Sequence, residues 1–183
     1  MKKIVSAALL FVAMLMCGSA MAAQPKAKDF IGEWTVTPET VAHILGEVPQ
    51  GMGDGEFSCK FDFVSKKLAD VYIGAKFQIP LEEGVDMVMT LSCELNCVWS
   101  YKKGVLNIEY YDVKAKLGEL TLVPENPQFQ MFMDMYRPTV EEEMSRLIID
   151  SFKDVAIVES GEVTIVGNKM VIEDDGECLV LER

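Results

Sequence analysis

The most regular feature of the chain is the alternation of apolar and polar positions over residues 85–101. Every odd position there is apolar, aromatic or Cys, and most even positions are polar. This period of two predicts a strand with one buried face. Because an ordinary strand has about five or six residues, a strand this long must twist, bend or carry a bulge, as strands do in a closed barrel.

Shorter segments with the same period predict further strands on both sides of this stretch. They cover residues 32–36, 56–63, 71–77, 105–111, 116–123, 155–160, 162–166, 169–173 and 177–183. Pro80 is expected to end the third of them, and Gly104, Gly161, Gly167 and Gly176 mark turns. A succession of strands joined mostly by short turns indicates an antiparallel meander.

The pattern becomes helical in two regions. Pro38 and Gly46 are placed to begin and end a short helix. The spacing after Asn126 predicts a helix that Pro138 stops, and Thr139 with Glu142 forms a capping box for a second helix. We therefore expect a helical pair inserted at about 127–153.

These elements predict a mainly β protein, an antiparallel up-and-down barrel of about eight strands with the helical pair before the last strands. A β-sandwich is the competing architecture. Residues 29–183 are long enough for one domain, preceded by a flexible lead at 23–28.

The N-terminus has the layout of a secretory signal peptide. Two lysines precede an apolar run over residues 4–16, which is too short to span a membrane, and Ala20 and Ala22 fit the cleavage rule. We expect residues 1–22 to be removed and the protein to be periplasmic or extracellular. Cleavage before Cys17, which would leave a lipid anchor in the envelope, is the alternative, but Met16 is large for that processing.

The composition is acidic. The chain has 17 basic and 29 acidic residues, and because only Lys2 and Lys3 precede residue 23, cleavage leaves 15 and 29, a net charge of −14. Such a surface repels phosphate backbones, which argues against nucleic acid as a partner.

Four cysteines follow the signal: Cys59, Cys93, Cys97 and Cys178. An even number in an exported chain predicts disulfides, with free buried thiols as the alternative. On one strand Cys93 and Cys97 would lie about 13 Å apart, too far to bond each other, so Cys59 would pair with one and Cys178 with the other. A Cys-x3-Cys spacing and a single histidine, His43, do not make a zinc site, and we expect no metal.

Several segments resemble a known family. The sequence DFIGEWTV carries Gly32-x-Trp34 on the first strand, and residues 99–110 and 165–183 are similar to the hairpins of small exported bacterial lipocalin-like (calycin-type) β-barrel domains. The resemblance covers residues 29–123 and 154–183. It implies that Trp34 closes one end of the barrel with Arg183 stacked across it, a cation–π contact of about 0.5–2 kcal/mol. The helical pair and the helix after the first strand depart from the family pattern.

We expect a non-catalytic protein without a cofactor that binds a small hydrophobic molecule in the barrel interior, because no nucleophile motif accompanies His43. The candidate cavity lining comprises Phe61, Phe63, Ile73, Phe77, Met87, Met89, Leu91, Leu106, Ile108 and Tyr110. The alternative is a protein-interaction module, an inhibitor or surface adaptor, with a filled barrel and contact loops at 46–56 and 124–138. Exposure of Met131, Met133 and Met135 together with the neighbouring aromatics would favour the alternative.

Overall fold

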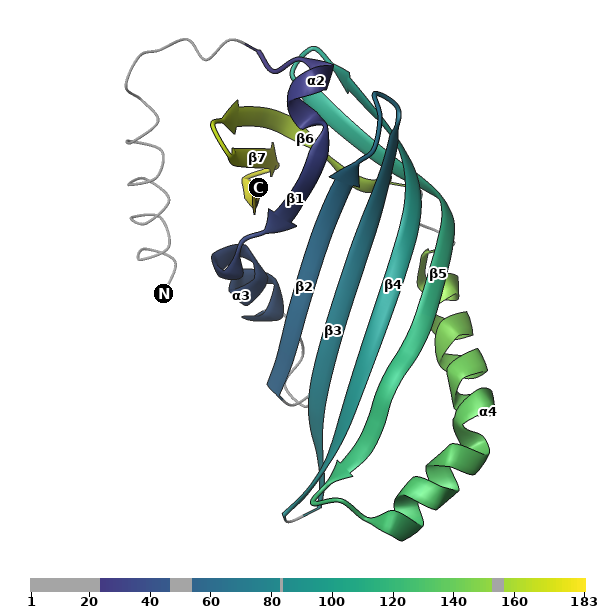
Figure 1. Ribbon diagram of the computed structural model, residues 1–183. Helices are drawn as coiled ribbons and strands as arrows, with labels where there is room; N and C mark the ends of the chain where they lie inside the picture. Colours follow the sequence, from purple (N-terminus) through teal and green to yellow (C-terminus); the bar gives the residue numbers. More distant parts are fainter. Residues whose placement is uncertain (1–23, 47–53, 83, 153–156) are drawn as a thin grey trace.

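The computed structural model describes residues 24–46, 54–82, 84–152 and 157–183 (Figure 1). The eight strands form one closed antiparallel barrel in sequential order, which confirms the predicted fold class. The ring closes because Thr35 pairs with Lys60 in β2 on one side and with Glu182 in β8 on the other. The elements are α2 (Ala27–Phe30), β1 (Gly32–Val36), α3 (Pro38–Gly46), β2 (Asp54–Phe63), β3 (Leu68–Glu82), β4 (Val85–Lys102), β5 (Val105–Val123), α4 (Pro127–Phe152), β6 (Ile157–Val166), β7 (Lys169–Asp174) and β8 (Glu177–Glu182).

The barrel is closed over only part of its length. Strands β3, β4 and β5 have 15, 18 and 19 residues, whereas β1, β7 and β8 have five or six. Strand β1 pairs with residues 60–63 of β2, and β6 pairs with residues 105–109 of β5. Beyond these pairs, β2–β5 continue as an open four-stranded sheet below the closed ring (Figure 1). We call the two parts the closed ring and the open sheet.

Two irregularities let β5 run as one strand where the pattern predicted two, at 105–111 and 116–123. Tyr111 is an extra residue between the partners of Asn96 and Cys97, and Gly118 and Glu119 together face Thr90. The Thr90 hydroxyl accepts the Glu119 amide N–H at 2.6 Å. Such bulges shift the side-chain alternation, so apolar residues on both sides of each bulge stay on the inner face. The same continuity holds for β3, which extends beyond Pro80 with irregular pairing.

The prediction of a helical pair is wrong, because α4 is a single helix of 26 residues with Pro138 inside it. Asn126 caps its first turn, where its side-chain oxygen accepts the amide N–H groups of Gln128 and Phe129 at 3.0 and 3.1 Å. Pro138 removes one backbone hydrogen bond without ending the helix, and Figure 1 shows the axis of α4 changing direction along its length.

Strand β6 is also continuous where Gly161 was expected to make a turn. Its residues up to Glu162 pair with β5, and its residues from Glu162 onward pair with β7. Gly161 therefore lies at a corner of the barrel. A Cβ atom there would lie 2.7 Å from the carbonyl oxygen of Glu173, so the close approach of β7 requires glycine.

Candidate functional site

The interior of the closed ring is filled by its own side chains. Phe30 of α2 enters one end, and its ring centroid lies 5.8, 5.1 and 5.0 Å from those of Phe63, Trp99 and Tyr101. Trp34, Leu106, Ile108, Met170 and Leu181 are fully buried in the same cluster. The candidate residues Phe61, Phe63, Leu106 and Ile108 therefore belong to a packed core. The tyrosine hydroxyl of Tyr101 is buried there without a hydrogen-bond partner among the described residues.

Trp34 and Arg183 meet at the end of the ring, as the resemblance implied. The Arg183 guanidinium carbon lies 4.5 Å from the Trp34 ring centroid, and the indole N–H donates to the Phe30 carbonyl at 2.7 Å. The Arg183 amide N–H donates to Asn168 at 3.0 Å, which fixes the last residue of the chain. This contact ties α2, β1 and the C-terminus together, so its role in this structure is to close the ring.

The remaining candidate residues lie on the inner face of β3, β4 and β5. Ile73 and Tyr110 pack against the closed-ring core, and Met87, Met89 and Leu91 pack around α4. On β5, Leu117 and Leu120 of the open sheet are buried against Met133 of α4, and Leu122 is also buried. Phe57, Phe77, Ile79, Met87 and Met89 are only half-buried, so the cover that α4 provides is incomplete over β2–β4.

Helix α4 is fixed to the free side of β5 by polar as well as apolar contacts. The Ser145 hydroxyl donates to the Ala115 carbonyl at 3.0 Å, and the Arg137 guanidinium donates to the Gly118 carbonyl at 2.8 Å. These carbonyls belong to the part of β5 that β6 does not pair, and capping them protects an edge strand from pairing with another chain. Among the side chains of α4 that the structure describes, Met133 is the buried one, packed against Leu117 and Leu120.

The opposite side of α4 exposes four large apolar side chains, which we call the α4 patch. Met131, Phe132, Met135 and Tyr136 are 71%, 53%, 65% and 45% exposed. They follow the i, i+1, i+4, i+5 spacing of one helix face, and the Phe132 and Tyr136 rings lie 4.4 Å apart. Taking about 200 Å² for a complete side chain, the patch exposes roughly 450 Å². Patches of about 300–600 Å² on a monomer are often functional.

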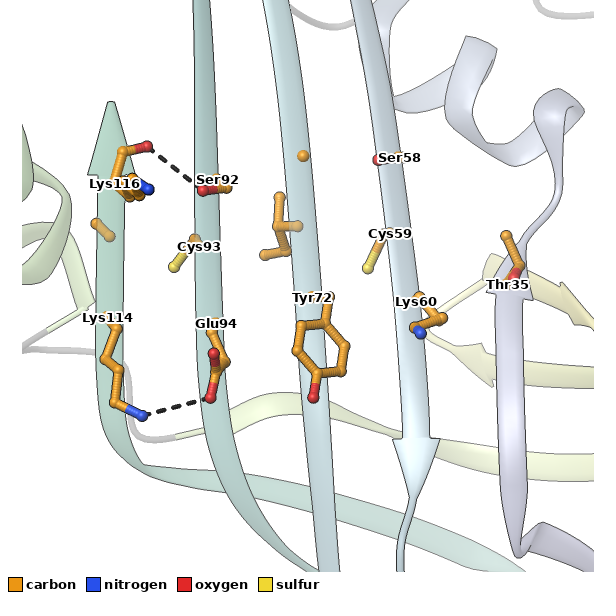
Figure 2. Close-up of a pocket in the computed structure, with 13 residues that line it drawn as sticks. Thr35, Ser58, Cys59, Lys60, Tyr72, Ser92, Cys93, Glu94, Lys114 and Lys116 are labelled. Carbon is orange, nitrogen blue, oxygen red and sulfur yellow. Dashed lines mark hydrogen bonds and ion pairs between the residues drawn. The ribbon is translucent and has the colours of Figure 1, made fainter. Parts of the chain in front are cut away.

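A shallow hollow of about 700 Å³ lies on the outer face of the sheet (Figure 2). Its lining crosses β1–β5 in register and includes Thr35, Ser58, Lys60, Tyr72, Gly74, Ser92, Glu94, Lys114 and Lys116. Lys60 pairs with Glu33 at 3.1 Å and lies 5.0 Å from the Tyr72 ring centroid, and Lys114 pairs with Glu94 at 3.4 Å. The hydrogen bond that the Lys60 ammonium donates to Glu33 raises the pKa of Lys60. Since these charges already have partners, the hollow has the character of a solvated sheet face.

The four described cysteines are free thiols, so the expected disulfides are not present. Cys59 and Cys93 both face Ile73 from opposite sides, which places them two strands apart, about 10 Å and too far to bond. Burial raises the pKa of Cys59 and of Cys97 to about 12, and burial also raises the pKa of Cys93 and Cys178. The thiols are therefore protonated at neutral pH, which does not suit a nucleophile.

Other candidate chemistry is sparse in the described part of the chain. His43 lies on the exposed side of α3, 3.3 Å from the Glu177 carboxylate of β8. In the described ranges, no group of three or more His, Cys, Asp or Glu side chains is placed to hold a metal ion. Among the helices described, none is long and apolar enough to cross a membrane.

The α4 patch was not among the candidate site residues, but the alternative interpretation named Met131, Met133 and Met135 with the neighbouring aromatics. Of these methionines, Met131 and Met135 are exposed and Met133 is buried. Six of the eight residues at 129–136 are Met, Phe or Tyr, which is more than one buried helix face accommodates. Comparisons with protein-family models, with curated proteins and with solved structures gave no match.

Proposed function

We propose that the protein is an interaction module that binds a partner protein through the α4 patch. The observation that carries the proposal is the exposure of Met131, Phe132, Met135 and Tyr136 on a helix whose other face is fixed to β5. Held from behind in this way, the patch cannot turn inward without breaking the contacts of Met133 and Ser145. The closed ring supports the same proposal, because buried side chains of the described residues pack against one another in its interior.

A capture experiment tests this function. Residues 23–183 and the variant Met131→Gln/Met135→Gln would be immobilised, and proteins retained from an envelope extract of the source cells would be quantified. Leu147→Gln is the matched control, because Leu147 lies on the same helix, is 59% exposed and is outside the patch. We expect one or more proteins to be retained by the parent chain and by Leu147→Gln but lost with the double variant. A purified candidate should then bind with the same order of affinities. Equal retention by all three chains would refute the proposal.

A second candidate function is binding of a small apolar molecule on the inner face of the open sheet. The expected site was the interior of the closed ring. The half-buried state of Phe57, Phe77, Ile79 and Met89 favours it, since flexible and aromatic side chains adapt to apolar ligands. An environment-sensitive apolar dye provides the test. Phe77→Ser should weaken dye binding several-fold while Val64→Ser, an exposed control, does not. No dye uptake by the parent chain would exclude this site.

We also propose that the protein is exported and acts outside the cytoplasm, with cleavage after Ala22. The lysines and apolar run of the N-terminus support this. The intact mass of the protein isolated from its own envelope would be that of residues 23–183. A chain that begins with a lipid-modified Cys17 would be heavier, and an uncleaved chain would contradict export by this route.

A further inference from the structure

The outward side of α4 carries charge next to the α4 patch. Met135 and Glu142 are seven residues apart, two helical turns, so both lie on the same side of the helix about 10 Å from each other. Glu143 and Asp150 are exposed nearby on the same side. Thus a single helix face presents an apolar half over residues 131–136 and an acidic half over residues 142–150.

The acidic half is not balanced by the basic residues of the helix. Helix α4 contains five carboxylates and two arginines. Arg137 is bound to Glu141 at 3.5 Å and to the Gly118 carbonyl, and Arg146 is bound to Glu143. Both arginines therefore already face carboxylates within α4, and the helix as a whole has three more carboxylates than arginines.

From these observations, and resting on the proposed function, we infer that the partner presents a segment in which apolar side chains are followed, about 10 Å further on, by lysine or arginine. The apolar half would receive the large side chains, and the acidic half would receive the basic ones. A basic group also matches the whole chain, whose net charge is −12. Such charge complementarity sets the orientation and the choice of partner more than the total affinity.

A second copy of this chain fits the surface less well. Two patches facing each other would bury roughly 900 Å², below the 1,200 Å² or more of stable interfaces. Two acidic halves would also meet if the helices lay parallel, in two chains that each carry a charge of −12. In an antiparallel pair the acidic halves would be left uncovered. The acidic half likewise disfavours an anionic lipid surface. Neither objection applies to a basic polypeptide segment.

Two labelled peptides test the inference on residues 23–183. Both carry the same Leu and Phe block, followed either by four lysines or by four glutamates. We expect the lysine peptide to bind about three- to thirtyfold more tightly by fluorescence anisotropy, since each exposed ion pair contributes modestly, and the difference should shrink as salt is raised. Glu142→Gln/Glu143→Gln should reduce the preference for lysine, because it weakens binding of the lysine peptide and relieves the repulsion of the glutamate peptide. Met131→Gln/Met135→Gln should weaken the binding of both peptides at least fivefold, and Leu147→Gln is the control.

The outcomes separate the inference from the function on which it rests. If the double methionine variant loses its captured partner but the two peptides bind equally, the interaction function stands and the basic partner is wrong. If sedimentation shows dimers that disappear in the methionine variant, the partner is a second copy of the chain and not a basic segment. If the chain binds zwitterionic lipid vesicles but neither peptide, the partner is a membrane. If the methionine variant changes neither capture nor peptide binding, both proposals fail. Circular dichroism that matches the parent chain shows that each variant is folded.

Discussion

Both proposals depend on which side of α4 faces the sheet, and two neighbouring methionines test this directly. Met133 is 8% exposed and packs against Leu117 and Leu120, whereas Met131 is 71% exposed on the patch. Met133→Ala removes three heavy atoms from an apolar contact. Transfer of these atoms, with a small residual cavity, corresponds to about 2–3 kcal/mol, in the lower part of the range for buried Met→Ala changes. Met131→Ala should change the free energy of unfolding by less than about 0.5 kcal/mol.

The measurement uses urea unfolding of residues 23–183 together with amide hydrogen exchange. In thermal unfolding of a chain of this size we expect Met133→Ala to lower Tm by about 4–12 °C, because 1 kcal/mol corresponds to about 2–4 °C. Since α4 packs mainly on β5, part of the loss should appear as faster exchange in α4 alone. If Met131→Ala is as destabilising as Met133→Ala, or more so, the helix is rotated from the arrangement described above, and the α4 patch is not a surface.

Three further variants test the packing of the ring. Gly161→Ala should destabilise by about 1–3 kcal/mol, because the new Cβ would lie 2.7 Å from the Glu173 carbonyl, whereas Gly55→Ala meets nothing nearer than 3.6 Å and should be neutral in thermal unfolding. Tyr101→Phe removes a buried hydroxyl without a partner among the described residues, so urea unfolding should show equal or higher stability, by up to about 1 kcal/mol; a clear loss would reveal a partner. Burial raises the pKa of Glu159, so the folded chain binds this proton more tightly than the unfolded one. Its contribution is therefore present below pH 4.5 and is lost as pH rises through the raised pKa, and Glu159→Gln should flatten that decline in unfolding measured as a function of pH.

The strands were predictable from sequence because each alternates strictly, but their lengths were not. The alternation breaks at Tyr111 and at Gly118, and a break in one strand looks like a gap between two. Only the partner strand distinguishes them, since β4 runs unbroken opposite both positions. The same reasoning applies to Gly161, where a corner of the barrel and a turn give the same local signal.

The sequence also could not place the candidate site. It grouped Phe63 and Phe77 on equivalent faces of neighbouring strands, but Phe63 lies in the closed ring and Phe77 in the open sheet. Whether an inward residue is buried depends on how far β1 and β6–β8 reach along β2–β5. That reach is set by the pairing of strands distant in sequence, which a local pattern does not contain.

The division of the barrel explains why an exposed apolar surface can be tolerated on α4. The closed ring has a continuous core, tied at one end by Trp34 and Arg183, and residues of the open sheet such as Ile73 and Tyr110 pack against this core. Helix α4 covers the open sheet along β5 with one helix face and with the hydrogen bonds from Arg137 and Ser145. The other face is then unconstrained by folding. Residues there that were under no other requirement would be expected to be polar, because exposed Met, Phe and Tyr favour aggregation. Their presence beside an acidic segment therefore argues for a partner that covers them.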